Sequence, residues 1–159
     1  MLIISGGQSG ADLGGLVAAE LCGCQTGGFM PKGFRTENGP RPERARHFEM
    51  LEHSSSSYVP RTVDNIRISN ATIVFGKESS SGSRMTIREC IKQKKPCLAV
   101  PWPRPPTTRE GVSLVIDFLI EHDPQILNIA GNRESVNPGI KNYVIKTLCE
   151  VLGDGEDYE

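Results

Sequence analysis

The chain has 159 residues, a length typical of one domain, and its 18 Lys and Arg against 19 Asp and Glu give a net charge of −1. Hydrophobic residues make up 37% and charged residues 23%, which is ordinary for a folded globular protein and excludes a disordered chain. The balanced charge argues against a nucleic-acid binder, which usually has a clear basic excess, and against a dedicated membrane surface.

The N-terminal residues and the cysteines indicate the cellular compartment of the protein. Gly6 and Gly7 stop the apolar run 1–5, so this run is too short for a signal peptide or a membrane-spanning helix. The five cysteines are Cys22, Cys24, Cys90, Cys97 and Cys149. We expect them to be buried free thiols in a reducing cytoplasm. The spacing of the first two does not fit a zinc site and the three histidines are scattered, so we expect no metal bound by protein ligands.

Short apolar runs alternate with helical periodicities along the chain. The runs predict strands at 2–5, 25–29, 71–75, 97–100 and 126–130. The apolar positions that mark the helices are, in chain order, Leu13, Leu16, Val17 and Leu21; Val63 and Ile66; Ile87, Cys90 and Ile91; Val112, Val115, Ile116 and Leu119; and Ile140, Tyr143, Val144, Leu148 and Val151. The alternation predicts a Rossmann-like three-layer α/β sandwich, with a mostly parallel sheet of about five or more strands flanked by helices.

The predicted domain covers 1–152, followed by an acidic tail at 153–159 that we expect to fray. The polar, proline-containing segment 30–60 is predicted to be a long functional loop. The proline-rich segment 101–108 is predicted to be a stiff surface connection. Asn137 is the expected N-cap of the last helix, with Pro138 at its first position. The helix around 112–120 is apolar on more than one side, which fits either a buried helix or the subunit interface of a homo-oligomer.

A glycine-rich stretch, SGGQSGAD at 5–12, connects the first predicted strand to the first predicted helix. Glycines let the backbone turn sharply and approach a ligand, and the amides and positive dipole end of a helix favour an anion. We therefore expect this loop, which includes Ser9, to contact an anionic ligand. The stretch matches neither the dinucleotide motif nor the P-loop, and a tight turn without a ligand is the alternative interpretation.

Two similar loops follow later strands, SSSGSRMT at 79–86 and AGNRES at 130–135. In a parallel sheet all three loops leave the strands at the carboxyl edge, where ligands bind in this architecture. Charge-assisted hydrogen bonds contribute roughly 1.5–3 kcal/mol each. Three donor clusters would together suffice for a phosphate or another tetrahedral oxyanion.

Basic residues can add positive charge near this edge. Lys32 and Arg35 lie just past the second predicted strand, and Arg61, Arg84 and Arg133 are further candidates. A solvated surface charge is the alternative for each of them. This alternative is as good as ligand contact for Arg61 and Arg84, and it is weaker for Lys32 and Arg133.

Acid–base candidates are fewer. Asp12, Glu37 and Glu134 adjoin the predicted pocket, and Asp12 also suits the first turn of a helix for its interaction with the dipole. No histidine adjoins a glycine loop, so no Ser/His/Asp or Cys/His arrangement can be assembled. The residues therefore favour binding over catalysis.

Five ordered motifs together resemble the molybdenum-carrier family: ISGGQSGAD (4–12), GGFMPKGFRTENG (27–39), YVPRTVDNIRISNATIVF (58–75), GSRMT (82–86) and LNIAGNRESVNPGI (127–140). This family is a circularly permuted branch of the SMF/DprA–LOG superfamily of Rossmann-like nucleotide binders. The resemblance covers nearly the whole chain. It implies ligand contacts at Gly6, Gly7, Gln8, Gly10, Asp12, Lys32, Arg35, Gly82, Ser83, Thr86, Arg133, Glu134 and Ser135.

The resemblance implies two activities. Carriers hold molybdenum cofactor, a pterin with a phosphate and a metal oxo group, whereas LOG-type phosphoribohydrolases cleave nucleoside monophosphates. The hydrolases carry Gly-Gly-x-Gly-Thr-x-x-Glu, and here Thr86 stands where the catalytic glutamate would fall. This difference argues against hydrolysis of that type.

The function that fits best is a cytoplasmic binding protein for a small anionic, phosphorylated ligand, either nucleotide-like or molybdenum cofactor or molybdate as cargo. The first alternative is a nucleotide- or phosphoribosyl-processing hydrolase that uses Asp12, Glu37 or Glu134. The second is a scaffold whose glycine loops are only turns. We expect neither nucleic acid nor membrane as a partner.

Overall fold

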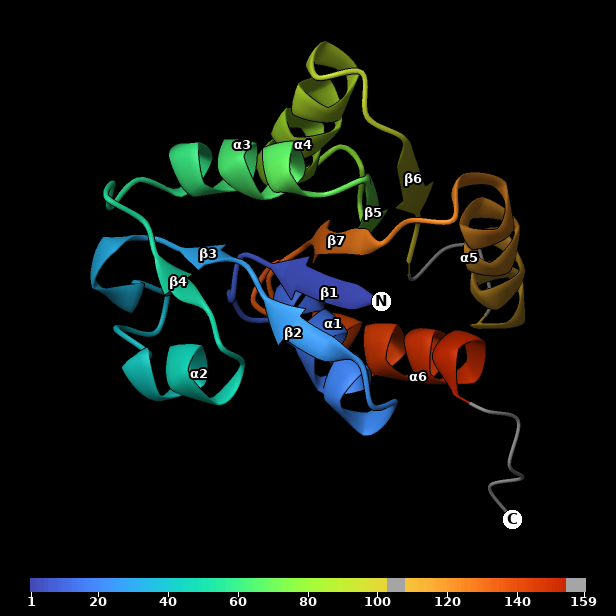
Figure 1. Cartoon of the computed structure of the whole chain (residues 1–159), viewed down its shortest axis with the longest axis horizontal. Coiled ribbons are helices and arrows are strands. Elements are labelled where there is room, and N and C mark those ends of the chain that lie inside the picture. Colours follow the sequence, from blue (N-terminus) through green and yellow to red (C-terminus); the bar gives the residue numbers. More distant parts are fainter. Residues whose placement is uncertain (103–107, 154–159) are drawn as a thin grey trace.

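The computed structural model describes residues 1–102 and 108–153, and a five-stranded parallel sheet lies at its centre (Figure 1). The strand order is β2-β1-β7-β5-β6, and every neighbouring pair is parallel. The strands are β1 (Leu2–Ser5), β2 (Gln25–Gly27), β5 (Ala71–Phe75), β6 (Cys97–Val100) and β7 (Ile126–Gly131). Strand β5, next to the central strand β7, is buried along its whole length, as expected for a parallel strand covered on both faces.

Helices cover both faces of the sheet. One face carries α1 (Ala11–Leu21), α5 (Thr108–His122) and α6 (Ile140–Leu152). The other face carries α3 (Tyr58–Ile68) and α4 (Ser81–Lys92), which lie above the sheet in Figure 1. The predicted three-layer α/β fold is confirmed. No helix in the described ranges is long and apolar enough to span a bilayer.

The segment predicted as a long loop at 30–60 contains regular structure. It includes η1 (Lys32–Phe34), α2 (Pro42–His47) and β4 (Leu51–Glu52), which pairs with β3 (Phe29–Met30) in a second, two-stranded sheet. These elements lie to the left of the main sheet in Figure 1, and α3 already begins at Tyr58. The predicted strand 25–29 is interrupted at Gly28, whose φ of 113° and close approach to the Ser5 carbonyl leave no room for a side chain.

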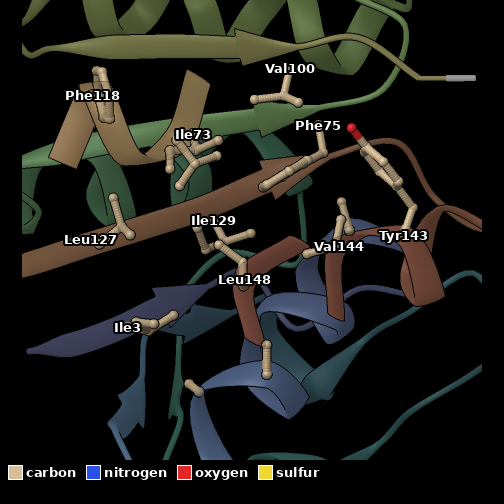
Figure 2. Packing of buried hydrophobic residues seen from close by; sticks show 14 of the residues in the cluster. Ile3, Ile73, Phe75, Val100, Phe118, Leu127, Ile129, Tyr143, Val144 and Leu148 are labelled. Atoms are coloured by element: carbon tan, nitrogen blue, oxygen red, sulfur yellow. The ribbon is translucent and has the colours of Figure 1, made fainter. Parts of the chain in front are cut away.

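The main apolar core lies between the sheet and the helices α1, α5 and α6. Figure 2 shows Ile73, Leu127 and Ile129 of the sheet facing Val144 and Leu148 of α6. All five side chains are fully buried. Each contributes roughly 1.5–3 kcal/mol to folding relative to an exposed position.

Helix α1 packs against the sheet through small residues rather than through its predicted leucine stripe. A methyl group on Gly14 would meet the Lys141 carbonyl of α6 at 2.8 Å, and one on Gly15 would meet Ile129 at 2.7 Å. Leu16 instead belongs to a second cluster with Met30, Ala45, Phe48 and Met50. Leu21, predicted to share the buried face, is 63% exposed because the stripe turns away from the sheet.

The predicted start of the last helix is wrong by two residues. Helix α6 begins at Ile140, with Gly139 as its N-cap in the left-handed region rather than Asn137. The reason is that the Asn137 amide turns inward and donates to the Trp102 carbonyl at 2.8 Å and to Asn132 Oδ1 at 3.2 Å.

Several predicted side-chain positions also differ. Ile91 is 71% exposed and Ile116 39% exposed, since α4 and α5 bury other faces. All five cysteines are free thiols, but only Cys90 is fully buried. Residues 103–107 of the predicted stiff connection and 154–159 of the predicted tail lie outside the described residues.

Candidate functional site

A cavity of about 440 Å³ opens at the carboxyl edge of the main sheet. The loops that follow β1, β5 and β7 line it together with the first turns of α3. The expectation that these three loops meet at one place is thereby confirmed. They do so because β7 lies between β1 and β5 in the parallel sheet.

Asn132, which is 3% exposed, joins the three loops. Its backbone carbonyl accepts from the Ala11 amide at 3.0 Å, which ties it to the loop after β1. Its side-chain Oδ1 accepts from the Lys77 amide at 2.6 Å, and its Nδ2 donates to Ser80 Oγ at 2.9 Å, both in the loop after β5. The cavity walls therefore have a fixed spacing before any ligand binds.

The cavity floor carries a buried pair of opposite charges. Arg61 of α3 and Asp12 of α1 have side chains only 12% and 7% exposed, and Arg61 Nη1 lies 3.7 Å from Asp12 Oδ2. A side chain on Gly6 would overlap the Arg61 guanidinium, so glycine is required for Arg61 to lie over the loop.

Burial sets the direction of both pKa shifts. Desolvation raises the pKa of Asp12, and the Arg61 charge together with the Gln8 backbone amide offsets part of the rise. Desolvation likewise lowers the pKa of Arg61, although a guanidinium stays charged in proteins. The pair is thus poorly solvated. The Arg61 guanidinium can interact with a second negatively charged group in addition to Asp12.

Gln8 lies beside this pair and is 3% exposed. Its Nε2 donates to the carbonyl of Gly6 at 3.3 Å and to that of Arg35 at 3.0 Å. Its Oε1 and the Nε of Arg61 are both buried, and neither has a hydrogen-bond partner among the described residues.

The outer part of the cavity combines an aromatic ring with apolar side chains. The guanidinium carbons of Arg133 and Arg35 lie 4.4 Å and 4.8 Å from the Tyr58 ring centroid, within the range of cation–π contact. Val59 and Val136, also in the lining, are 52% and 48% exposed. The Tyr58 ring thus contacts Arg133, which lines the cavity.

The N-terminus of α4 opens into the cavity. Ser80 is its N-cap and its hydroxyl accepts from the Ser83 amide. Ser81 and Gly82 line the cavity, and their amides donate to no group in the described part of the chain. Space around Gly82 is open, since an added methyl group would meet nothing within 4 Å. This helix end therefore presents unpaired donors and a positive dipole end to a ligand.

The N-terminus of α6, by contrast, is already occupied. The Glu134 carboxylate accepts from the Gly139 amide at 2.5 Å and from the Lys141 amide at 3.1 Å. Glu134 thus caps the helix and does not line the cavity. Its negative charge would also disfavour an anion at this helix end.

Glu37 holds residues 30–60, called the inserted segment below, against the glycine loops of the main sheet. Its carboxylate accepts from Ser9 Oγ at 2.5 Å and from Ser135 Oγ at 2.6 Å, which lie on two different glycine loops. The Arg44 guanidinium adds a bond to the Gly7 carbonyl at 2.7 Å. The two contacts attach residues 37 and 44 to the edge of the site.

Six of the predicted ligand residues line the cavity: Gly6, Gln8, Asp12, Gly82, Thr86 and Arg133. Eight do not: Gly7, Ser9, Gly10, Lys32, Arg35, Ser83, Glu134 and Ser135. Most of the eight support the walls, as when Ser83 Oγ accepts from Asn132 Nδ2 at 3.3 Å. Lys32 is exposed on η1, and Arg84 is exposed on α4.

The other twelve lining residues were not among the predicted contacts, and Tyr58, Met85, Asn128 and Asn132 are examples. Arg61 was only one of several candidate charges. The prediction placed the start of α3 too late, so the first turn of this helix was not recognised. A proline at 60 is typical of a first helical turn and could have indicated it.

The donor set of the site suits an anion rather than a bare cation. No group of three or more His, Cys, Asp or Glu side chains lies together within residues 1–102 and 108–153. Arginines, amides and hydroxyls predominate, and these groups bind oxyanions and phosphates.

The fold and the site define a Rossmann-like protein with a ligand-sized cavity at the carboxyl edge of a parallel sheet. Residues 3–152 match the circularly permutated YpsA SLOG family, and the chain belongs to this family. A comparison with curated proteins found no match. Among solved structures, the chain is 34% identical to a "putative molybdenum carrier protein" from Syntrophus aciditrophicus SB, with a TM-score of 0.86 over 95% of this chain and 93% of that one.

Proposed function

We propose that this protein binds a small phosphorylated ligand in the cavity, with the phosphate at the N-terminus of α4. The observation that carries the proposal is the convergence of the unpaired Ser81 and Gly82 amides with Arg61 and Arg133 on one cavity. Amides at a helix N-terminus and guanidinium groups are the usual donors to phosphate in proteins.

The cavity size supports a ligand larger than a single oxyanion. Its volume of about 440 Å³ falls within the roughly 300–1,000 Å³ of small-molecule sites. A nucleotide-like or pterin-like ligand would fill this space, with its flat ring at the Tyr58 and Val136 rim.

Molybdenum cofactor is one ligand of this kind. The name of the structural relative supports it, since that protein is described as a molybdenum carrier. No cluster of metal-binding side chains lies within the described ranges, so the protein would hold the pterin and phosphate of such a cargo rather than coordinate its metal. Molybdate itself would use the same amides and arginines as a phosphate.

The proposal is tested by removing one amide donor from α4. Ser81 is the first helical residue, and Ser80 has φ −64° and ψ 147°, the conformation favoured before proline. Ser81→Pro should keep the helix but remove the backbone N–H at position 81. Ser81→Ala keeps both the helix and this N–H. Because a hydrogen bond to a charged group contributes roughly 1.5–3 kcal/mol, we expect Ser81→Pro to weaken binding of GMP about 10- to 100-fold.

Isothermal titration calorimetry of both variants against GMP, phosphate and molybdate measures this effect. Equal affinities for Ser81→Pro and Ser81→Ala would contradict the placement of the phosphate. Absence of binding and of thermal stabilisation by all three compounds would favour the scaffold alternative.

The five free cysteines support a cytoplasmic location for this binding function.

A hydrolase acting on nucleotides is the second candidate, and one observation favours it. Of the three predicted acid–base residues, Asp12 alone lines the cavity, and burial raises its pKa toward the range of a general acid. Incubation with nucleoside monophosphates and chromatography for released base tests this candidate. Release that persists in Asp12→Asn would exclude Asp12 as the acid.

A further inference from the structure

The cavity extends inward from the carboxyl edge, along the face of the sheet that α3 and α4 cover. Asn128 and Ala130 of β7 line it, together with Thr62 of α3 and Thr86 of α4. Strand β7 ends at Gly131, and a strand rises about 3.3 Å per residue, so Asn128 lies roughly 10 Å inward of that end. The cavity therefore has an inner end, distinct from its opening at the edge of the sheet.

The side chain of Asn128, and not its backbone, faces this inner end. Strand β7 pairs with β1 on one side and with β5 on the other, and Asn128 has a partner in both ladders. Successive side chains of a strand point to opposite faces of the sheet. Figure 2 shows Leu127 and Ile129 on the side of α6, so Asn128 points to the other face, where the cavity lies.

Asn128 is a polar residue within the central strand, and one of its hydrogen-bonding atoms has no partner. Its Nδ2 donates to Thr72 Oγ1 at 3.3 Å. Its Oδ1 accepts no hydrogen bond from the described residues, and unlike Gln8 Oε1 it is not closed off from the cavity. Buried polar groups are nearly always paired in native proteins, so this oxygen needs a donor in the cavity, from water or from a ligand that displaces the water.

Two hydroxyl groups near Asn128 are also left as acceptors. Thr62 Oγ1 donates to the Tyr58 carbonyl, and Thr86 Oγ1 donates to the Gly82 carbonyl, both at 3.0 Å. Each hydroxyl uses its only proton in this bond, and its oxygen can still accept. The inner end therefore favours a neutral donor group over an anion, whereas the N-terminus of α4 offers donors to an anion.

We infer that the ligand places a hydroxyl or an amino group against Asn128 Oδ1, and that Asn128 thereby helps to determine which ligand binds. This inference rests on the proposed function and narrows it. The ligand is a phosphorylated compound with a neutral donor group on its sugar or its ring. Its phosphate lies at α4, because the inner end is lined by acceptors.

Three nucleotides tested on the unaltered protein identify the donor group: GMP, 2′,3′-dideoxy-GMP and IMP. The dideoxy compound lacks both ribose hydroxyls, and IMP lacks the exocyclic amino group of GMP. A site that accepts a hydrogen bond from a ligand rejects an analogue without the donor, so we expect one of the two analogues to bind about tenfold more weakly than GMP in isothermal titration calorimetry. Weak binding of the dideoxy compound identifies a sugar hydroxyl, and weak binding of IMP identifies the amino group.

The variant Asn128→Leu removes the acceptor and keeps a side chain of similar size. We expect the preference for GMP over the weaker analogue to fall from about tenfold to about twofold or less, because the donor group no longer has its partner. A general distortion of the site would weaken both compounds and keep the preference. Thr72→Val is the matched control, since it removes the bond between Thr72 and Asn128 but leaves Oδ1, and Thr72 does not line the cavity.

The outcomes separate this inference from the proposed function. Equal affinities of the unaltered protein for all three nucleotides would overturn the inference, and this comparison does not need a variant to fold. A preference that survives in Asn128→Leu, or that is lost equally in Thr72→Val, would also overturn it and leave phosphate binding in place. Binding of phosphate or molybdate without binding of any nucleotide would overturn the inference alone. Failure of all these compounds to bind would overturn both.

Discussion

At the scale of single residues, the site depends most on Asn132. Replacing it with alanine leaves the Lys77 amide and the Asn137 side-chain amide without their acceptor. Each buried donor left unpaired costs roughly 1–3 kcal/mol, so we expect Asn132→Ala to lower the free energy of unfolding by about 2–4 kcal/mol. Urea unfolding followed by circular dichroism measures the loss. The control is Asn142→Ala on the exposed surface of α6, and similar losses in both variants would refute this role.

The sequence predicts residues that adjoin strand ends better than residues that reach the site from elsewhere. Gly6, Gln8 and Gly82 could be predicted because the carboxyl edge of a parallel sheet is where loops meet. Tyr58 could not be predicted and Arg61 was only one of several candidate charges, since the positions of both depend on how α3 lies across that edge. Glu134 was predicted as a contact, and nothing in its spacing indicated that it would cap α6.

At the scale of elements, glycine has opposite effects in two helices. In α1, a methyl group on Gly15 would lie 2.7 Å from Ile129 in the core, whereas in α4 one on Gly82 would meet open space. Alanine is favoured over glycine in helices by about 1 kcal/mol. We therefore expect Gly82→Ala to raise the free energy of unfolding by up to about 1 kcal/mol. Overpacking typically costs about 1–3 kcal/mol, so Gly15→Ala should lower the free energy of unfolding despite the same gain in helix propensity.

Thermal and urea unfolding of the two variants without ligand tests this pair. Stabilisation by Gly15→Ala would show that α1 can shift away from the sheet. The same packing explains why the apolar stripe of α1 does not face the main sheet. Periodicity locates a buried face but does not say what covers it, and here a stretch of glycines and alanines faces the sheet while Leu16 faces the inserted segment.

At the scale of the whole molecule, the architecture was predictable and the strand order was not. Alternating strands and helices determine a parallel α/β sandwich, because such crossovers are right-handed and place helices on the faces. The insertion of β7 between β1 and β5 leaves no mark in the hydrophobic pattern. The two-stranded sheet of β3 and β4 was missed for another reason, since strands of two residues each are too short to show a period.

The inserted segment is joined to the rest of the molecule through Glu37, and this connection should depend on pH. Hydrogen bonds from the Ser135 and Ser9 hydroxyls lower the pKa of Glu37 below its ordinary value of 4.5. The folded state then binds the proton less tightly than the unfolded state. The stabilisation is therefore fully present above the ordinary pKa and is lost as the pH falls through the lowered one.

Glu37→Gln removes this charge while keeping the shape of the side chain. We expect the variant to be less stable than the parent by about 1–2 kcal/mol at neutral pH, since it weakens hydrogen bonds to a charged group. The difference should shrink below about pH 4.5, where the unfolded state of the parent begins to bind a proton at Glu37 that the folded state does not yet bind. Urea unfolding of both proteins between pH 7 and pH 3 measures the difference, with Glu150→Gln on the exposed face of α6 as the control. A difference that stayed constant across this range would mean that the carboxylate charge does not hold the segment. The bonds from Arg44 to the Gly7 carbonyl and from Gln8 to the Arg35 carbonyl would then account for the position of the segment.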